Sequence, residues 1–196
     1  MILSYLSSAH LARAKEQLAT GKPEALVYAA LELRFAVESR LSDYSDLAAT
    51  LRRNSKGSWS AKALAKHVDG VFPKGDFAYE ITFSSPKLSK DITVTYTPVS
   101  ARLKKIAARL GDYLHLAGAG RCTEEADFTR FRTLLEEGVA EMEYAASGEL
   151  NGPPLVADGK TVKLSMGSSG IPELSKLLVG EKIRVGIRKL YPPAKK

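Results

Sequence analysis

Apolar residues recur three and four positions apart along most of the first 147 residues, a spacing typical of amphipathic helices. The pattern predicts helices over 4–20, 23–53, 59–71, 99–117 and 123–148. The clearest apolar stripe belongs to the second helix and consists of Leu26, Ala30, Leu33, Val37 and Leu41. We therefore expect residues 1–147 to fold as a bundle of four or five helices.

The helical spacing is interrupted at 77–97, where two segments alternate apolar and polar residues with a period of two. This alternation predicts a β-hairpin inserted between helices. One face of its first strand consists of Phe77, Tyr79, Ile81 and Phe83. A two-stranded ribbon with so much aromatic surface has to pack against something else. It therefore predicts a homo-oligomer or a larger complex.

The strongest boundary signal in the chain is Asn151-Gly-Pro-Pro154. Short segments with a period of two follow it, at 155–156, 161–164 and 182–188. The expected fold class is therefore α+β: a helical bundle with an inserted β-hairpin and a small β-rich C-terminal segment. The expected domains are a helical domain over 1–150 and a small basic module over 153–196.

The positive charge of the chain is concentrated in that C-terminal segment. The net charge is +7, and residues 1–154 contribute only +1, from 20 Lys and Arg against 19 Asp and Glu. Residues 155–196 contribute +6, from 9 against 3, and their basic residues include Lys182, Arg184, Arg188 and Lys189. A basic segment of this kind can bind the phosphates of a nucleic acid. The alternative is a basic surface that only keeps the chain in solution.

Several function classes are disfavoured by the composition. Cys122 is the only cysteine and there are three scattered histidines, so we expect no disulfide, no zinc site and no other cofactor. No stretch approaches the roughly 20 apolar residues that span a bilayer, and the first residues do not resemble a secretory signal. We therefore expect a cytoplasmic protein without a membrane partner.

Candidate chemistry lies on the predicted helix over 99–117. Arg102, Lys105 and Arg109 are spaced three and four residues apart, so they form one basic stripe that can hold phosphates, or an ordinary solvated face. The same helix carries Arg109-Leu-Gly-Asp-Tyr-Leu-His115. An arginine followed, after a short spacer, by a histidine on a late helix of a small bundle resembles the HEPN superfamily. The segment 29–38 is also similar to those bundles, and the resemblance covers residues 1–147.

The resemblance implies a metal-independent endoribonuclease. In such an enzyme the ribose 2′-OH attacks the adjacent phosphate and leaves a cyclic phosphate. His115 would act as general acid or base, and Arg109 would stabilise the charge that develops on the phosphoryl oxygens. The family usually assembles this site across a dimer interface. The implied partner is RNA in preference to DNA, and the implied setting is a bacterial phage-defence or toxin–antitoxin system.

Other interpretations of the same residues stay open. Six residues along an ideal helix place Arg109 and His115 about 120° apart around the axis and ~9 Å apart along it. Leu110 stands where the family motif often has a polar residue, a departure that a non-catalytic RNA-binding member would also show. A third interpretation is a helical interaction or assembly subunit without catalytic activity, in which His115 only forms a hydrogen bond near the end of its helix.

Overall fold

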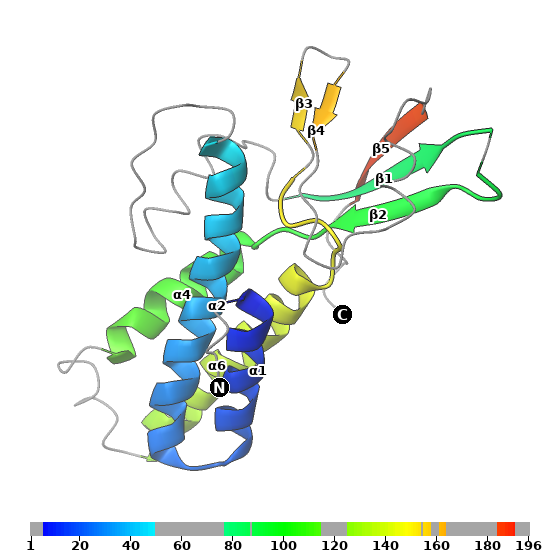
Figure 1. Cartoon of the computed structure of the whole chain (residues 1–196). Coiled ribbons are helices and arrows are strands. Elements are labelled where there is room, and N and C mark those ends of the chain that lie inside the picture. The colour runs from blue at the N-terminus through cyan, green and yellow to red at the C-terminus, as the bar shows by residue number, and fades with distance from the viewer. Residues whose placement is uncertain are drawn as a thin grey trace.

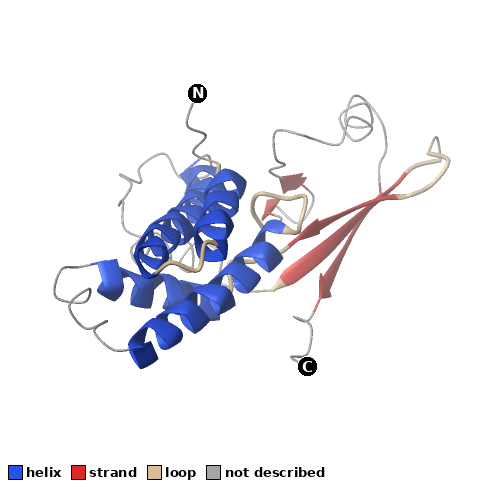
Figure 2. Ribbon diagram, turned by 90° about the horizontal axis from the view of Figure 1, so that it is seen from below, coloured by secondary structure: helices blue, strands red, loops and turns tan. Residues whose placement is uncertain are grey.

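The computed structural model describes residues 6–49, 77–86, 88–114, 125–153, 155–157, 161–163 and 184–190. The helices there are α1 (Ser7–Ala19), α2 (Pro23–Ala49), α4 (Ala101–Leu114) and α6 (Glu125–Ala146). The strands are β1 (Ala78–Ser84), β2 (Ile92–Tyr96), β3 (Leu155–Ala157), β4 (Thr161–Lys163) and β5 (Arg184–Leu190) (Figure 1). Helices gather on one side of the molecule and strands on the other (Figure 2). The predicted α+β class is confirmed, and the helix predicted over 59–71 lies outside the described residues.

Local signals set the ends of several helices. Gly21, with φ of 75°, adopts the left-handed conformation that ends a helix after α1. Pro23 then begins α2, where its missing N–H costs nothing and its fixed φ suits the first turn. The backbone N–H of Leu103 donates to the Ser100 hydroxyl at 3.0 Å, so Ser100 caps the start of α4.

Helix α2 lies at the centre of the bundle and contacts α1, α4 and α6. Its predicted apolar stripe is buried in the hydrophobic core. Helix α6 approaches closely at Gly138, where a Cβ atom would lie only 2.7 Å from Leu33 Cδ2 and 3.0 Å from Ile106 Cγ2. The small residue therefore lets three helices meet at one point.

The predicted hairpin is present and is part of a larger sheet. Strand β1 pairs antiparallel with β2, from Tyr79 opposite Tyr96 to Phe83 opposite Ile92. On its other side, β1 pairs antiparallel with β5 over seven residue pairs, from Ala78↔Leu190 to Ser84↔Arg184. The sheet order is thus β2-β1-β5, and β3 and β4 form a separate two-stranded sheet.

The aromatic face of the hairpin is not the exposed surface that the sequence suggested. Ile81 is 0% and Phe83 3% exposed, and Val94 and Tyr96 beside them are also buried. This face is covered within the chain, so it gives no support to self-association. The oligomer prediction has to rest on another surface.

Strand β5 also changes the expected relation between the two domains. The predicted boundary at 151–154 separates the hairpin from the C-terminal segment along the chain, but β5 lies next to β1 in one sheet. Deleting residues 153–196 would therefore remove an entire edge strand and leave one side of β1 unpaired. The proposed independence of 153–196 stays a prediction, and this pairing weighs against it.

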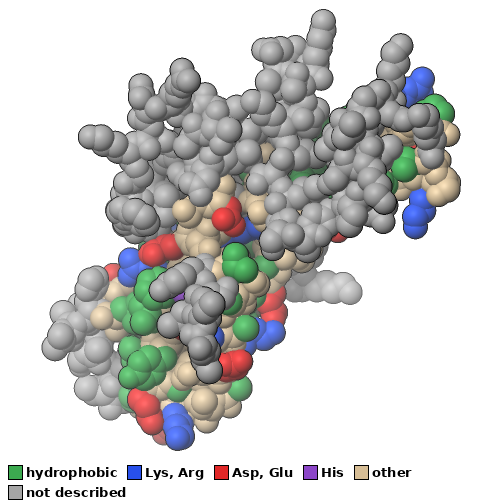
Figure 3. All heavy atoms as spheres, viewed as in Figure 1, with side chains coloured by type: hydrophobic (Ala, Val, Ile, Leu, Met, Phe, Trp, Pro, Cys, Tyr) green, Lys and Arg blue, Asp and Glu red, His purple; other side chains and the backbone are tan. Residues whose placement is uncertain are grey.

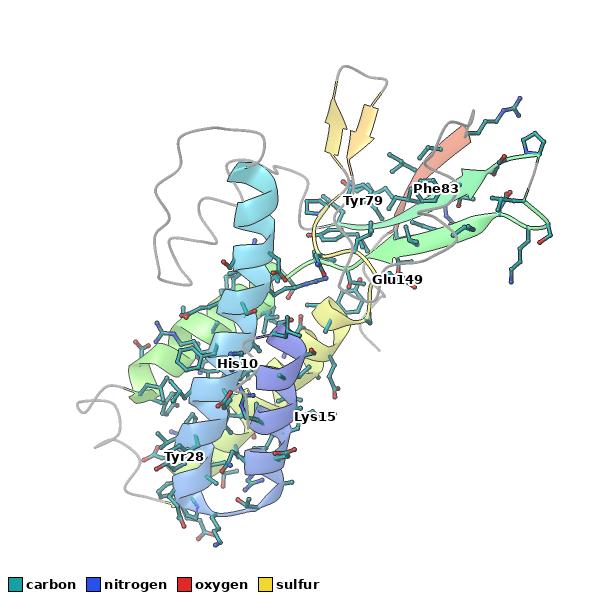
Figure 4. The ribbon with its side chains drawn as sticks, viewed as in Figure 1. His10, Lys15, Tyr28, Tyr79, Phe83 and Glu149 are labelled. Carbon is teal, nitrogen blue, oxygen red and sulfur yellow. The ribbon has the colours of Figure 1, made fainter. Side chains whose placement is uncertain are left out.

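Hydrogen bonds join the bundle to the sheet at the end of α6. The buried Arg40 guanidinium of α2 donates to the carbonyl oxygens of Ala145 and Leu150, at 3.2 and 2.7 Å. The Thr97 hydroxyl donates to the same Ala145 carbonyl at 3.0 Å. The Glu149 carboxylate accepts the backbone N–H and the hydroxyl of Thr95, at 2.7 and 2.6 Å (Figure 4). Three elements are thus fixed to one another at this junction.

The Glu149 contact predicts a dependence of stability on pH. Partial desolvation would raise the pKa of this carboxyl, but hydrogen bonds from Thr95 outweigh it and lower the pKa below its ordinary value. The contribution to stability is therefore complete above the pKa of an unfolded glutamate, about 4.3, and is lost as pH falls through the folded pKa. We expect Glu149→Gln to lower Tm at pH 7 and the difference from wild type to shrink below about pH 4.

Thermal melts between pH 3 and pH 7 measure this effect. The matched control is Glu16→Gln, which changes an exposed carboxylate on α1. A Tm difference for Glu149→Gln that stays constant across this range would contradict the assignment.

Candidate nucleic-acid interface

Strand β5 presents the densest group of exposed basic side chains among the described residues. Six of its seven residues are exposed, Leu190 being the exception. Arg184, Arg188 and Lys189 all lie on it, at the open edge of the three-stranded sheet. An edge strand has backbone N–H and C=O groups directed away from the sheet. Strand β5 therefore combines positive charge with a backbone edge that no other described strand pairs with.

Two of these cations share the polar face of the sheet. Side chains alternate along a strand, so Arg184 and Arg188 point to the same face as their β1 partners, Ser84 and Glu80. The two arginines are four residues apart, about 13 Å at the usual strand rise. Gly186 lies between them, and the nearest described atom to a Cβ at that position would be Thr82 O, at 4.0 Å. Among the described residues, Gly186 therefore leaves space on this face between the two guanidinium groups.

Hydroxyl groups continue this face across the sheet. Thr82 lies opposite Gly186 in β5 and opposite Thr93 in β2. The Thr82 and Thr93 hydroxyl oxygens are 3.4 Å apart. Hydroxyl groups can donate and accept hydrogen bonds. The row Gly186, Thr82 and Thr93 therefore offers neutral polar contacts beside the charged ones.

The charges of β5 have partial partners within the chain. Arg188 Nη2 lies 2.8 Å from Glu80 Oε1, but the Arg188 side chain is still 69% exposed. An exposed pair of this kind contributes little energy, so Arg188 can turn toward an anion at small cost. Lys189 Nζ lies 3.2 Å from the centre of the Phe77 ring, a cation–π contact. Lys182, predicted with this group, lies outside the described residues.

The three residues of the basic stripe predicted on α4 have different surroundings in the structure: one is paired with carboxylates, and two are exposed. Arg102 binds two carboxylates of α6, at 2.7 Å from Glu137 and 3.4 Å from Glu141. Its charge is therefore compensated, and phosphate binding by Arg102 would require these ion pairs to break. Lys105 and Arg109 are exposed one turn apart on α4. His115 lies outside the described residues, so the structure gives no distance between Arg109 and His115.

One cluster was missed by the sequence analysis. His10 Nδ1 lies 2.7 Å from Glu32 Oε2 and 2.7 Å from Arg13 Nη2, and Arg13 Nε lies 3.0 Å from the same carboxylate oxygen. Burial would raise the pKa of Glu32, but the hydrogen bonds from Arg13 and His10 lower it below its ordinary value. The only sequence signal is the three-residue spacing of His10 and Arg13. Because the His10 side chain is buried, this cluster joins α1 to α2.

In the described ranges, no three His, Cys, Asp or Glu side chains gather as ligands of a metal ion would. No helix described here is long and apolar enough to cross a membrane. Comparison of the chain with protein-family models, curated proteins and solved structures found no match. The HEPN resemblance therefore stays a prediction made from the sequence.

Proposed function

We propose that this chain binds nucleic acid, RNA in preference to DNA, along the basic edge strand β5. The observation that carries the proposal is the exposure of Arg184, Arg188 and Lys189 on one edge strand, where the Arg188 side chain stays 69% exposed beside its ion pair with Glu80. Phosphate contacts from such cations supply most of the affinity of a sequence-independent interface.

The polar face of the sheet supports RNA as the ligand. Hydrogen bonds to the ribose 2′-OH allow a protein to distinguish RNA from DNA. The Thr82 and Thr93 hydroxyls lie in the row between the two arginines. Phosphates would bind at Arg184 and Arg188, and the sugars between them would approach these threonines.

The HEPN resemblance extends the proposal in two ways. It adds cleavage of the bound RNA, with Arg109 and His115 as the reacting pair, and the exposure of Arg109 leaves its guanidinium accessible to a phosphate. It also favours a cytoplasmic role in a bacterial phage-defence or toxin–antitoxin system. Binding and cleavage are separate claims, because a chain that only binds would use β5 in the same way.

The binding claim is tested with the double variant Arg184→Ala, Arg188→Ala. Each phosphate contact to a single strand adds about 0.7 to the slope of log K against log salt. We therefore expect the slope to fall by about 1.4 and the affinity at 0.1 M salt to fall about 25-fold. Fluorescence anisotropy with a labelled single-stranded RNA over a series of salt concentrations measures both values.

The control removes the same charge from the bundle, with Lys22→Ala between α1 and α2 and Arg130→Ala on α6, both at exposed positions. It should leave both values close to wild type. Equal losses in the two double variants would mean that only net charge matters, and the proposed site would be wrong.

A second pair of variants tests the site by increasing affinity. Glu80→Gln removes the carboxylate that lies 2.8 Å from Arg188 and should tighten RNA binding about two-fold at 0.1 M salt, because an exposed ion pair of this kind contributes only about 0.5 kcal/mol. Glu136→Gln makes the same change of charge on α6, where this carboxylate lies 3.9 Å from Arg132. If both variants tighten binding equally, the RNA does not bind at β5.

A second candidate function is favoured by a different surface. Exposed apolar side chains on α2 are typical of an interaction or assembly subunit. Such a subunit would assemble without affinity for RNA, so the anisotropy measurement distinguishes it from the proposed RNA-binding role.

A further inference from the structure

Arg34 and Glu38 form an ion pair on α2 that leaves most of the arginine head group unused. Arg34 Nε lies 3.1 Å from Glu38 Oε1, and the two side chains are 29% and 19% exposed. Among the described residues, neither Nη1 nor Nη2 of Arg34 has a hydrogen-bond or ion-pair partner. The carboxylate thus holds the guanidinium through Nε, and the four N–H groups of the Nη atoms remain for another acceptor.

The other arginine ion pairs of the described helices and strands occupy at least one Nη atom. The ion-pair nitrogen is an Nη atom in the contacts Arg102–Glu137, Arg130–Asp127, Arg132–Glu136 and Arg188–Glu80. Figure 3 shows basic and acidic side chains close together over the helical part of the face in view. Arg13 binds Glu32 through Nε, as Arg34 binds Glu38, but its Nη2 lies 2.7 Å from His10 Nδ1. Among these pairs, Arg34 is therefore the arginine that keeps both Nη atoms for a ligand.

Gly111 of α4 provides the space into which this guanidinium extends. A Cβ atom at position 111 would lie 3.0 Å from Arg34 Nη1 and 3.7 Å from Arg34 Cζ. Glycine inside a helix is less favourable than alanine, and Gly111 is a buried residue within α4. The missing side chain therefore has a packing role, because it lets Arg34 lie directly against the backbone of α4.

We propose that Arg34 binds a phosphate group through Nη1 and Nη2 at the contact between α2 and α4, as a site separate from β5. A planar guanidinium can donate two parallel hydrogen bonds to two oxygens of one phosphate. Glu38 and Gly111 are positioning residues, because the ion pair and the backbone contact restrict the arginine before the ligand arrives. A side chain that is already restricted loses less conformational entropy on binding.

The charge of α4 favours an anion at this place. The helix carries four basic residues and one acidic residue, Asp112. Arg102 is paired with carboxylates of α6, but Lys105 and Arg109 are exposed and lie within about 10 Å of Gly111 along the helix axis. Positive charges at this distance raise the local concentration of an anion. A phosphodiester of single-stranded RNA and a free phosphate ion present the same oxygens, so two experiments are needed to tell them apart.

A titration with inorganic phosphate tests the site directly. The side-chain Nε–H signal of Arg34, identified by its absence in Arg34→Gln, is followed by NMR up to about 50 mM phosphate at constant ionic strength. We expect a saturable shift with a Kd of about 10 mM. The reference is the Nε–H signal of Arg132, an arginine of similar exposure in an i,i+4 pair on α6. A shift of the Arg34 signal no larger than that of Arg132 would overturn the proposal.

Gly111→Ala separates phosphate binding from packing. The added methyl group displaces the guanidinium of Arg34, so the affinity for phosphate should fall about three-fold or more. The same substitution favours the helix, so Tm should rise by about 3 °C. A purely structural contact would give the change in Tm without the change in affinity, and that result would refute the role of Gly111. If the methyl group lowers Tm instead, Arg34→Gln measures the loss of affinity without any change on α4.

The second experiment identifies the source of the phosphate. At 0.1 M salt, Arg34→Gln should weaken binding of a labelled single-stranded RNA about five-fold, the contribution of one phosphate contact. Arg132→Gln removes the same charge from a pair of similar exposure and should have little effect. Equal losses in the two variants would exclude RNA as the ligand of Arg34. A saturable NMR shift without any loss of RNA affinity would assign the site to free phosphate.

Failure of this proposal and failure of RNA binding at β5 give different results. A wild-type chain that binds no RNA would contradict the role of β5, and the titration with inorganic phosphate would still decide the role of Arg34. RNA binding that depends on Arg184 and Arg188, with no phosphate-dependent shift at Arg34, would support β5 and overturn the second site.

Discussion

Replacing His115 with alanine is expected to lower RNA cleavage by about 10²- to 10⁴-fold, the usual loss for a positioned general acid or base. Arg109→Ala should lower the rate by about 10²- to 10³-fold, because the developing negative charge on the phosphoryl group loses its partner. Arg109→Ala should keep the Tm of wild type, since Arg109 is exposed on α4. Single-turnover cleavage of mixed RNA, with and without EDTA, measures the rates.

Arg130→Ala is the control for Arg109→Ala. It removes one positive charge from an exposed position on α6, outside the basic stripe of α4, and should change the rate only slightly. Cleavage that EDTA abolishes, or that survives in His115→Ala, would contradict the mechanism. Salt-sensitive binding without any cleavage would favour a non-catalytic RNA-binding module.

Replacing Arg40 with methionine is expected to destabilise the protein by about 3 kcal/mol, the largest effect on stability that we predict. Arg40 is 5% exposed, and its guanidinium binds two carbonyl oxygens and, at 3.2 Å, the Asn151 side chain. Methionine keeps a similar unbranched shape but removes the guanidinium donor of the buried Leu150 carbonyl and one donor of the Ala145 carbonyl, which keeps the Thr97 hydroxyl. For a chain of this size the loss corresponds to a fall in Tm of roughly 10 °C.

Arg130→Met is the control, because the Arg130 side chain is 77% exposed and lies 3.6 Å from Asp127 in an ordinary surface pair. Its effect should stay within about 0.5 kcal/mol. Urea unfolding of both variants gives the free energies. If Arg40→Met costs less than about 1 kcal/mol, the junction between bundle and sheet does not depend on this side chain.

The elements themselves could be predicted because their signals are local. The spacing of Leu26, Leu33 and Val37 marks the buried face of α2, and all three are buried in the structure. The alternation over 77–83 and 92–96 marks the hairpin, whose two strands are close in sequence. Each of these signals extends over one helix or one hairpin, so no information about distant residues was needed.

Contacts between distant segments could not be predicted in the same way. The pairing of β5 with β1 joins segments about one hundred residues apart, and neither strand encodes its partner in its own alternation. Arg102 appears free when α4 is considered alone, because its two carboxylates belong to α6. The exposed apolar side chains of α2 did have a signal, since Val27 and Leu31 are apolar on the side of the helix opposite the buried residues.

The site was predictable only in part, for the same reason. The basic tail drew attention to Arg184, Arg188 and Lys189, and all three side chains are exposed in the structure. Their place on a sheet edge, with Thr82 and Thr93 across the polar face, depends on the register of three strands. The sequence alone shows only a local excess of positive charge. The structure shows where these cations lie on the sheet.

Photo-cross-linking of bound RNA, followed by peptide mapping, tests the central claim most directly. Cleavage after Glu181 releases residues 182–196, which contain all of β5, as one peptide. If RNA binds along β5, this peptide carries most of the cross-linked nucleotide, and Arg184→Ala with Arg188→Ala removes that signal. Cross-links confined to α1, α2 or α6, and unchanged in that variant, would contradict the account.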